Sequence, residues 1–330
     1  MTQTVFVTRT IPEVGLNAIK AEFQTVIWEH TTPPSKSDII QNANGCSGIV
    51  TLLSDPIDAE VIESLPQLRV ISQYAVGFDN IDITAATRKG IIVTNTPGVL
   101  TESTADLTWA LIMSVCRRIV EADRYVREGE WKVAWGPKML LGRDIHNSTL
   151  GIIGLGRIGR AVARRATGFS MRILYHSRTR NDEAKQTERE TGAEWTNLKT
   201  LLKESDIITI HVPLNEDTRN MIASHELAMM KPGTVLVNTS RGSVIDEDAL
   251  YHHLKSGHLG GAGLDVFRQE PVSPQNPLLE LPNVVVVPHV GSATIATRDR
   301  MAKICAENLI AALGGITPPH IVNPEAIGNE

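Results

Sequence analysis

The sequence has few cysteines and few aromatic residues. Of its 330 residues, 4% are Phe, Trp or Tyr, and only Cys46, Cys116 and Cys305 carry thiols. Three cysteines that are far apart and odd in number argue against a disulfide framework and against a zinc site. We therefore expect small buried thiols, as in a protein of the reducing cytoplasm, and no metal centre.

Long hydrophobic runs and a strong excess of one charge are also missing. The N-terminal segment has an apolar run of only three residues, which does not make a secretory signal. The longest apolar stretch, residues 107–116, is about half a membrane span, so we expect it to form the buried face of a helix. The net charge of −5 and the shortness of the basic clusters argue against nucleic acid as a partner. The sequence thus predicts a globular cytoplasmic protein that binds neither membranes nor nucleic acid.

Short β-branched segments alternate with helical patterns along almost the whole chain. This alternation is typical of βαβ units and predicts parallel sheets covered by helices on both faces. A continuous valine run in the last segment predicts a strand that is buried on both faces. The predicted strands lie at 4–8, 48–53, 69–76, 91–95, 149–156, 172–177, 206–214, 234–242, 261–266 and 284–291.

Two α/β domains follow from this order. Residues 100–291 form the predicted dinucleotide-binding domain, which begins with a helical stretch at 101–131. Residues 1–99 form the predicted substrate domain, and we expect 292–330 to return to it because the second strand series is complete by residue 290. The predicted fold class is α/β with two doubly wound parallel sheets, one Rossmann-type and one flavodoxin-like.

A glycine fingerprint opens the second series. Gly154, Gly156 and Gly159 form G-x-G-x-x-G directly after a predicted strand and at the start of a predicted helix. In this context the first glycine allows a tight turn, the second allows close approach of a pyrophosphate, and the third allows helix and strand to pack closely. The phosphates would then lie on helix N-terminal amides, so the pattern predicts a dinucleotide site.

The end of the following strand indicates which dinucleotide is bound. An NAD site often has an acidic residue about 20 residues after the fingerprint, but here the position is held by His176. Arg178 could pair with a 2′-phosphate, and Ser177 and Thr179 could donate hydroxyl hydrogen bonds. The stretch therefore predicts a preference for NADP(H), with use of NAD(H) left open. The alternative is that Arg178 and Arg180 merely begin a solvated loop.

Polar residues also follow three later strands. Arg241 comes just after one strand, Asp265 ends the next with Glu270 five residues on, and His289 ends the valine run. Because ligands bind outside the carboxyl ends of strands in doubly wound sheets, these side chains can converge over one cofactor.

The motifs around these residues resemble those of a known family. The segments "GLGRIG", "NTSRGSVIDEDAL", "GAGLDVFRQEP" and "PHVGSAT" are similar to the D-isomer-specific 2-hydroxyacid dehydrogenases, and the resemblance extends to "VGFDNID" at 76–82. Within the family, residues 135–166 and 173–180 are most similar to the glyoxylate/hydroxypyruvate reductases, a branch that includes 2-ketogluconate reductases.

The resemblance implies a mechanism. Protonated His289 would give its proton to the substrate carbonyl oxygen while hydride arrives from the nicotinamide. The carboxylate of Glu270 would favour the protonated form of that histidine near neutral pH. Arg241 would bind the carboxylate of a 2-oxo acid and help polarise its carbonyl, and Asp265 would orient the nicotinamide side of the cofactor.

The resemblance also implies substrate and cofactor contacts. Backbone amides around Val76 and Gly77 would hold the substrate carboxylate from the other domain, in a cleft whose closure excludes water. Trp135 would either reach the active site of the other subunit of a homodimer or only anchor the dimer interface, which we expect in the cofactor domain. The implied cofactor-binding residues are Thr104, Gly154, Leu155, Gly156, Arg157, Ile158, Gly159, Ser177, Arg178, Thr179, His211, Val212, Pro213, Thr218, Thr239, Asp265 and Gly291.

The predicted function is NADPH-dependent reduction of small 2-oxo acids, foremost glyoxylate and hydroxypyruvate, to D-2-hydroxy acids. Residues 51–54 offer no charge to select a sugar acid or a phosphate, which favours short substrates, although 2-ketogluconate and phosphite-type oxidation remain open. Glu270 argues against a formate dehydrogenase, which would pair the histidine with glutamine. An end at residue 330 argues against a phosphoglycerate dehydrogenase with an added regulatory domain, and short termini argue against a cofactor-sensing corepressor.

Overall fold

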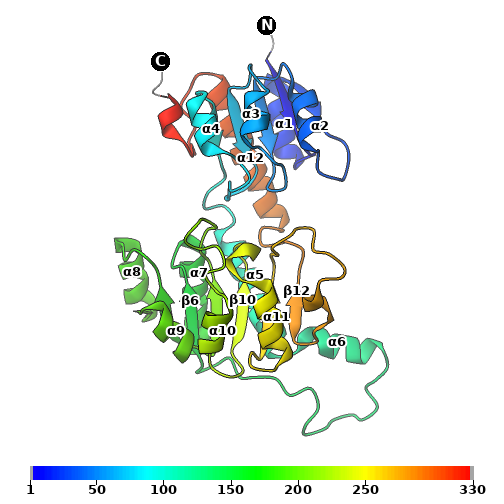
Figure 1. Cartoon of the computed structure of the whole chain (residues 1–330), viewed down its shortest axis with the longest axis vertical. Coiled ribbons are helices and arrows are strands. Elements are labelled where there is room, and N and C mark those ends of the chain that lie inside the picture. Colours follow the sequence, from blue (N-terminus) through cyan, green and yellow to red (C-terminus); the bar gives the residue numbers. More distant parts are fainter. Residues whose placement is uncertain (1–2, 328–330) are drawn as a thin grey trace. The chain divides into compact units, whose positions relative to one another are not determined.

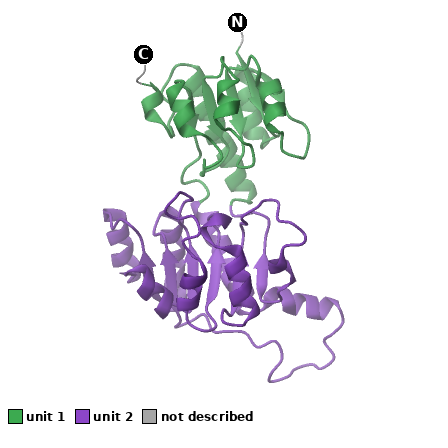
Figure 2. Cartoon of the chain, in the orientation of Figure 1, with its two compact units in different colours: residues 1–100, 292–330 green, residues 101–291 purple. Residues whose placement is uncertain are grey.

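The computed structural model describes residues 3–327, which fall into two compact units (Figure 2). Unit 1 runs to Leu100 and resumes at Ser292, and unit 2 is Thr101–Gly291. Each unit is built on a sheet of parallel strands with helices on both faces (Figure 1). The predicted fold class, two doubly wound parallel-sheet α/β domains, is confirmed.

The sheet of unit 1 has the order β2-β1-β3-β4-β5. Its centre is fully buried, since β3 and β4 are covered along their whole length. The strands are β1 (Thr4–Val7), β2 (Gln24–Ile27), β3 (Gly48–Thr51), β4 (Val70–Gln73) and β5 (Ile92–Thr94). Our sequence analysis missed β2, because this edge strand is only partly buried and lacks a continuous apolar run.

Helices of unit 1 pack on both faces of its sheet. One face carries α1 (Glu13–Glu22) and α12 (Ile295–Leu313), and the other carries α2 (Lys36–Ala43), α3 (Ala59–Glu63) and α4 (Ile83–Arg88). A Cβ atom at Gly15 of α1 would lie only 2.3 Å from the backbone oxygen of Ala302 in α12, so the two helices are in backbone contact. This contact holds α12, which follows unit 2 in the sequence, against α1 of the first hundred residues.

The sheet of unit 2 has the order β12-β11-β10-β9-β6-β7-β8. Its strands are β6 (Thr149–Ile153), β7 (Arg172–His176), β8 (Glu194–Trp195), β9 (Ile207–Ile210), β10 (Val235–Asn238), β11 (Gly261–Leu264) and β12 (Val284–Val286). The core on one face includes α5 (Thr101–Cys116), α7 (Arg157–Ala166) and α8 (Asp182–Thr191), and the core on the other includes α9 (Leu198–Glu204), α10 (Ser224–Met229) and α11 (Glu247–Lys255). Single turns of 3₁₀-helix are η1 (Thr167–Phe169), η2 (Gly242–Val244), η3 (Pro277–Glu280) and η4 (Pro324–Ile327).

The prediction of one helical stretch over 101–131 is wrong. Helix α5 ends at Cys116, Arg118 adopts a left-handed conformation with φ 53°, and α6 (Ile119–Arg127) begins after it. The cause is a contact that is distant in sequence, because the Arg143 amide donates to the Cys116 carbonyl over 2.7 Å and ends α5 there. Gly142 permits this approach, since a Cβ atom at that position would lie 2.3 Å from the same oxygen.

The valine run is also less buried than predicted. Strand β12 covers only Val284–Val286, and 39% of Val286 is exposed. The reason is position, because β12 is at the edge of the sheet and pairs with β11 alone.

Two further expectations concern burial. The apolar stretch 107–116 does form the buried side of α5, and all three cysteines are buried and unpaired, as predicted. Within residues 3–327, no helix is both long enough and apolar enough to span a membrane.

Candidate active site

The glycine fingerprint forms the turn between β6 and α7. Gly154 has φ +98°, a conformation that other residues rarely adopt, and it lies against the backbone of His211 at the end of β9. A Cβ atom at Gly159 would lie 2.2 Å from the Gly154 carbonyl oxygen, so only glycine lets α7 begin this close to the turn.

The amides at the start of α7 are available to a ligand. The N–H groups of Leu155, Gly156, Arg157 and Ile158 have no hydrogen-bond acceptor within residues 3–327, and a Cβ atom at Gly156 would meet nothing within 4 Å. Free amides at a helix N-terminus attract anions through their hydrogens and through the helix dipole. The loop therefore fits the pyrophosphate of a dinucleotide.

The segment after β7 contains two arginines with different partners. Arg180 binds both oxygens of Glu188 at 2.6 Å, so its guanidinium is already held by a carboxylate. Arg178 lies 3.1 Å from Asp217, and both side chains are more than 70% exposed. Arg178 is thus the arginine whose guanidinium can leave its partner and bind a phosphate at a small cost in free energy. The sequence analysis missed Asp217, because it is distant in the chain and no local pattern marks it.

The predicted catalytic histidine and carboxylate are in direct contact. Nδ1 of His289 lies 2.7 Å from Oε2 of Glu270, and the Phe267 amide donates to the other carboxylate oxygen over 3.0 Å. Burial alone would raise the pKa of Glu270, but the hydrogen bond and charge of His289, the Phe267 amide and the charge of Arg241 together lower it below its usual value. Glu270 is therefore held as a carboxylate beside the ring.

The backbone of His289 is in an uncommon conformation, with φ 53°. Its amide donates to the Asp265 carbonyl over 2.8 Å. The Asp265 carboxylate accepts from the amides of Val290 at 2.6 Å and Gly291 at 3.0 Å. Burial raises the pKa of Asp265 above its usual value, although these two amides and His289 oppose the shift. Asp265 thus fixes the segment that carries the histidine.

Arg241 lies at the end of β10, beside the loop that carries Glu270. The Asn238 side chain donates to the Arg241 carbonyl over 2.9 Å and so shapes the turn. At the next residue, Gly242, a Cβ atom would lie 1.9 Å from the carbonyl carbon of Phe267. The turn after β10 therefore rests directly on the backbone of the loop that follows β11.

The other predicted cofactor residues line the same edge of the unit 2 sheet. Thr104 donates to the Gly291 carbonyl over 3.2 Å, and Thr239 pairs with Thr108 at 3.0 Å. Thr218 donates to the Pro213 carbonyl over 2.6 Å and so closes the loop after β9, which also contains Val212.

The side chains of two further predicted residues, His211 and Trp135, differ strongly in burial. Both ring nitrogens of His211 are buried and have no partner within residues 3–327, and burial lowers the pKa of this histidine to about 3. The side chain is therefore neutral at physiological pH. Trp135 is 74% exposed, and within the described part of the chain it makes no ring contact with another aromatic residue.

In unit 1, the predicted substrate amides follow β4. The N–H groups of Val76 and Gly77 have no acceptor within residues 3–327, whereas their carbonyls accept from Asn95 at 2.8 Å and Gln73 at 3.0 Å. The peptide of the Gly77 N–H is thus fixed by its Val76 oxygen, and that of the Val76 N–H by its Ala75 oxygen, which accepts from the Thr96 amide at 2.9 Å. Both hydrogens are left for a ligand.

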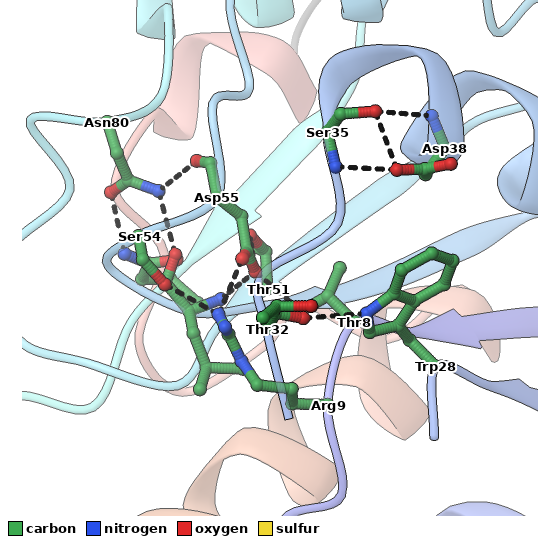
Figure 3. Close-up of polar contacts among 12 residues, drawn as sticks. Thr8, Arg9, Trp28, Thr32, Ser35, Asp38, Thr51, Ser54, Asp55 and Asn80 are labelled. Atoms are coloured by element: carbon green, nitrogen blue, oxygen red, sulfur yellow. Dashed lines mark hydrogen bonds and ion pairs between the residues drawn. The ribbon is translucent and has the colours of Figure 1, made fainter. Parts of the chain in front are cut away.

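A polar network holds the neighbouring loop after β3 (Figure 3). Asp55 is fully buried and accepts from Thr8, Thr51 and Arg9, at 2.5, 3.1 and 2.6 Å. Asn80 donates to the carbonyls of Leu52 and Asp55 and accepts from Gln73. The loop after β3 and the loop after β4 are thereby joined, a connection that the sequence analysis did not detect.

Comparisons with known proteins identify the class. Residues 109–291 match the model of the D-isomer specific 2-hydroxyacid dehydrogenase, NAD binding domain. The chain belongs to this family, and it is therefore an NAD(P)-dependent 2-hydroxyacid dehydrogenase that uses a nicotinamide cofactor.

Individual relatives are similar over nearly their whole length. A glyoxylate reductase from Korarchaeum cryptofilum is 56% identical over 99% of this chain and 98% of its own. A crystal structure from Thermus thermophilus has a TM-score of 0.91 at 44% identity and covers 97% of this chain and 100% of the other. An NADPH-dependent glyoxylate/hydroxypyruvate reductase from Sinorhizobium meliloti, solved with NADP and malonate, has a TM-score of 0.87 at 32% identity, covering 99% and 98%.

Proposed function

We propose that this protein is an NADPH-preferring reductase of small 2-oxo acids, with glyoxylate and hydroxypyruvate as substrates and D-2-hydroxy acids as products. The observation that carries the proposal is the pairing of His289 with Glu270 at 2.7 Å, on the same edge of the sheet as the dinucleotide loop. The names of the similar reductases support the choice of substrates.

In the proposed reaction, separate residues handle the proton and the substrate carboxylate. The Glu270 carboxylate holds Nδ1 of His289, which leaves Nε2 to give its proton to the substrate carbonyl oxygen. Arg241 binds the substrate carboxylate, with further hydrogen bonds from the free amides of Val76 and Gly77. A reduced nicotinamide, when bound to unit 2, would supply the hydride for the carbonyl carbon. Unit 2 is then the dinucleotide-binding domain and unit 1 the substrate domain.

The preference for NADPH rests on the segment after β7. Arg178 is exposed, and among the described residues its ion pair is with the equally exposed Asp217, so its guanidinium can exchange this carboxylate for a 2′-phosphate. Ser177 and Thr179 lie on the same turn, where the Ser177 hydroxyl donates to the Thr179 carbonyl. Because no acidic residue ends β7, that strand end does not repel a 2′-phosphate, and Asp217 is the carboxylate that the phosphate has to displace from Arg178.

We further propose a homodimer that forms through unit 2, in the cytoplasm. Helix α6 has no buried residue, and together with the following loop it extends away from the rest of unit 2 (Figure 1). Its apolar side chains, and those of the loop, are about half exposed or more: Ile119, Val120, Val126, Trp131, Val133, Trp135 and Leu141. An apolar surface of this kind is typical of a subunit interface.

The substrate proposal is tested by steady-state kinetics with NADPH and a panel of glyoxylate, hydroxypyruvate, 2-ketogluconate and, in the oxidative direction with NADP, phosphite. We expect kcat/KM to be highest for glyoxylate or hydroxypyruvate. The His289→Asn variant should lose at least about 100-fold in kcat while its affinity for NADPH stays unchanged. Higher kcat/KM for 2-ketogluconate or phosphite would contradict the assigned substrates, and an active His289→Asn variant would contradict the assigned acid.

A further inference from the structure

The loop that carries Glu270 depends on a carboxylate outside the predicted site. This loop, residues 267–276, connects β11 with η3. Beside it, at the first position of α11, lies Glu247, a residue that is only 8% exposed and that the sequence analysis did not single out. A buried carboxylate needs partners, and both of its oxygens find them in the loop.

Glu247 binds the loop at both ends. One carboxylate oxygen accepts a hydrogen bond from the backbone amide of Arg268. The other accepts from the side-chain amide of Asn276 over 3.2 Å, and the oxygen of the same side chain accepts from the Leu278 amide at the start of η3. A single side chain therefore fixes the spacing between the beginning and the end of the loop.

The first of these contacts lies next to the catalytic pair. Two consecutive amides point to two carboxylates, since Phe267 donates to Glu270 and Arg268 donates to Glu247. The peptide between them is pressed against Gly242, at the end of the turn that carries Arg241. This peptide is therefore held between Glu247 and Gly242, and it directly follows the amide that binds Glu270.

Other support for the loop comes from Val272, which packs against the core of unit 2, and from the exposed ion pair of Arg268 with Asp248. A surface pocket of about 190 Å³ adjoins the loop, lined by Glu247, Arg268, Val272 and Asn276 among others. On this side the loop is held by the apolar contact of Val272 with the core and by the hydrogen bonds of Glu247, which fix its backbone at Arg268 and its end at Asn276.

We propose that Glu247 is a positioning residue for the reaction, which keeps Glu270 directed at His289 through the backbone of residues 267 and 268. The inference rests on the proposed function, because it takes Glu270 and His289 to be the groups that handle the proton. It predicts that Glu247 controls the pH range of the reaction without touching substrate or cofactor.

The test compares Glu247→Ala and Glu247→Gln with the unaltered enzyme in glyoxylate reduction by NADPH between pH 5 and about 10, a range that spans the titration of histidine. If the Glu270 carboxylate no longer points at His289, it stabilises the protonated ring less. The pH at which kcat/KM falls on the alkaline side should therefore be lower in Glu247→Ala than in the unaltered enzyme. The value at neutral pH should fall roughly 10- to 100-fold. The affinity for NADPH, measured by fluorescence titration, should stay within about two-fold, because the fingerprint loop is unchanged.

Two further variants serve as references. Asp248→Asn is the matched control, since this neighbouring carboxylate pairs with the side chain of Arg268 at the surface and not with its backbone; its pH profile should be unchanged. Glu247→Gln keeps an acceptor for the Arg268 amide but turns a second donor toward Asn276, so its profile should lie between those of Glu247→Ala and the unaltered enzyme. It also serves as the test if Glu247→Ala does not fold.

Glu270→Gln separates the two proposals. If this variant shifts the alkaline limit and the Glu247 variants do not, Glu247 has only a structural role and the inference is wrong. If Glu270→Gln itself leaves the pH profile unchanged, the proposed roles of Glu270 and His289 are wrong. A shift in Glu247→Ala equal in direction to that in Glu270→Gln supports the inference.

Discussion

Two carboxylates near His289 have their pKa values moved in opposite directions. The pKa of Glu270 is lowered, because His289, the Phe267 amide and the charge of Arg241 together outweigh burial. The pKa of Asp265 is raised, because burial outweighs the two amides that it accepts from. The first carboxylate contacts the His289 ring, whereas the second accepts from the backbone amides of the segment that carries this histidine.

Replacing Glu270 with glutamine should change the pH dependence of activity. The carboxylate favours the charged ring, so its loss should lower the alkaline limit of glyoxylate reduction and reduce kcat/KM about 100-fold. In the unaltered protein, the lowered pKa of Glu270 means that its carboxylate stays ionised at its usual pKa value of 4.5 and is protonated only as the pH falls further. Rate profiles between pH 4 and about 10 measure both limits; equal profiles for the two proteins would contradict this role.

The pair of Arg178 and Asp217 should set how strongly NADPH is preferred. Asp217→Asn removes a carboxylate that competes with the 2′-phosphate, so KM for NADPH should fall by up to about five-fold, the range of an exposed ion pair, while KM for NADH stays the same. Glu216→Gln is the control, because this exposed carboxylate is the preceding residue. If KM for NADPH rises in Asp217→Asn, the aspartate assists binding and the competition model is wrong.

At the scale of elements, the sequence predicted the parts of the site that local patterns determine. The fingerprint at Gly154, Gly156 and Gly159 and the polar strand ends at Arg241 and His289 follow from strand order and from the convergence of carboxyl ends. Contacts between segments that are far apart in the sequence could not be predicted, because no local pattern marks them. The break after Cys116 depends on Arg143, and the loop of Glu270 depends on Glu247.

The hydrogen bond between the Arg143 amide and the Cys116 carbonyl, at the break between α5 and α6, can be tested by mutation. Gly142→Ala would place a methyl group 2.3 Å from the Cys116 carbonyl oxygen. The segment must then move and the hydrogen bond that ends α5 is strained, so the free energy of unfolding in urea should fall by roughly 1–3 kcal/mol. Gly168→Ala is the control, because a Cβ atom there meets nothing within 4 Å and φ is not positive. Equal unfolding midpoints for the two variants would show that α5 ends for another reason.

At the scale of the whole molecule, the proposed dimer accounts for an apolar surface that the single chain leaves exposed. Val126→Asp on α6 should convert the dimer into a monomer in analytical ultracentrifugation, because a charge cannot be buried at an apolar interface without a partner. Val14→Asp on α1 is the matched control, since Val14 is 49% exposed and Val126 is 54% exposed. A monomeric unaltered protein would contradict the proposal.

Trp135→Ala distinguishes the two roles open to this residue. If the indole reaches the active site of the partner subunit, the variant should remain a dimer and lose kcat/KM for glyoxylate. If it only anchors the interface, dimerisation should weaken and activity should follow the fraction of dimer. Sedimentation and kinetics on the same samples separate these outcomes.

The proposed function is an NADPH-dependent reduction in which Arg178 selects the cofactor. The most direct measurement is kcat/KM for glyoxylate reduction with NADPH and with NADH, for the unaltered protein and for Arg178→Ala. The account predicts a clear preference for NADPH that falls about ten-fold or more in the variant, as expected for loss of a charged hydrogen-bonding partner. A preference for NADH that the variant leaves unchanged would contradict it.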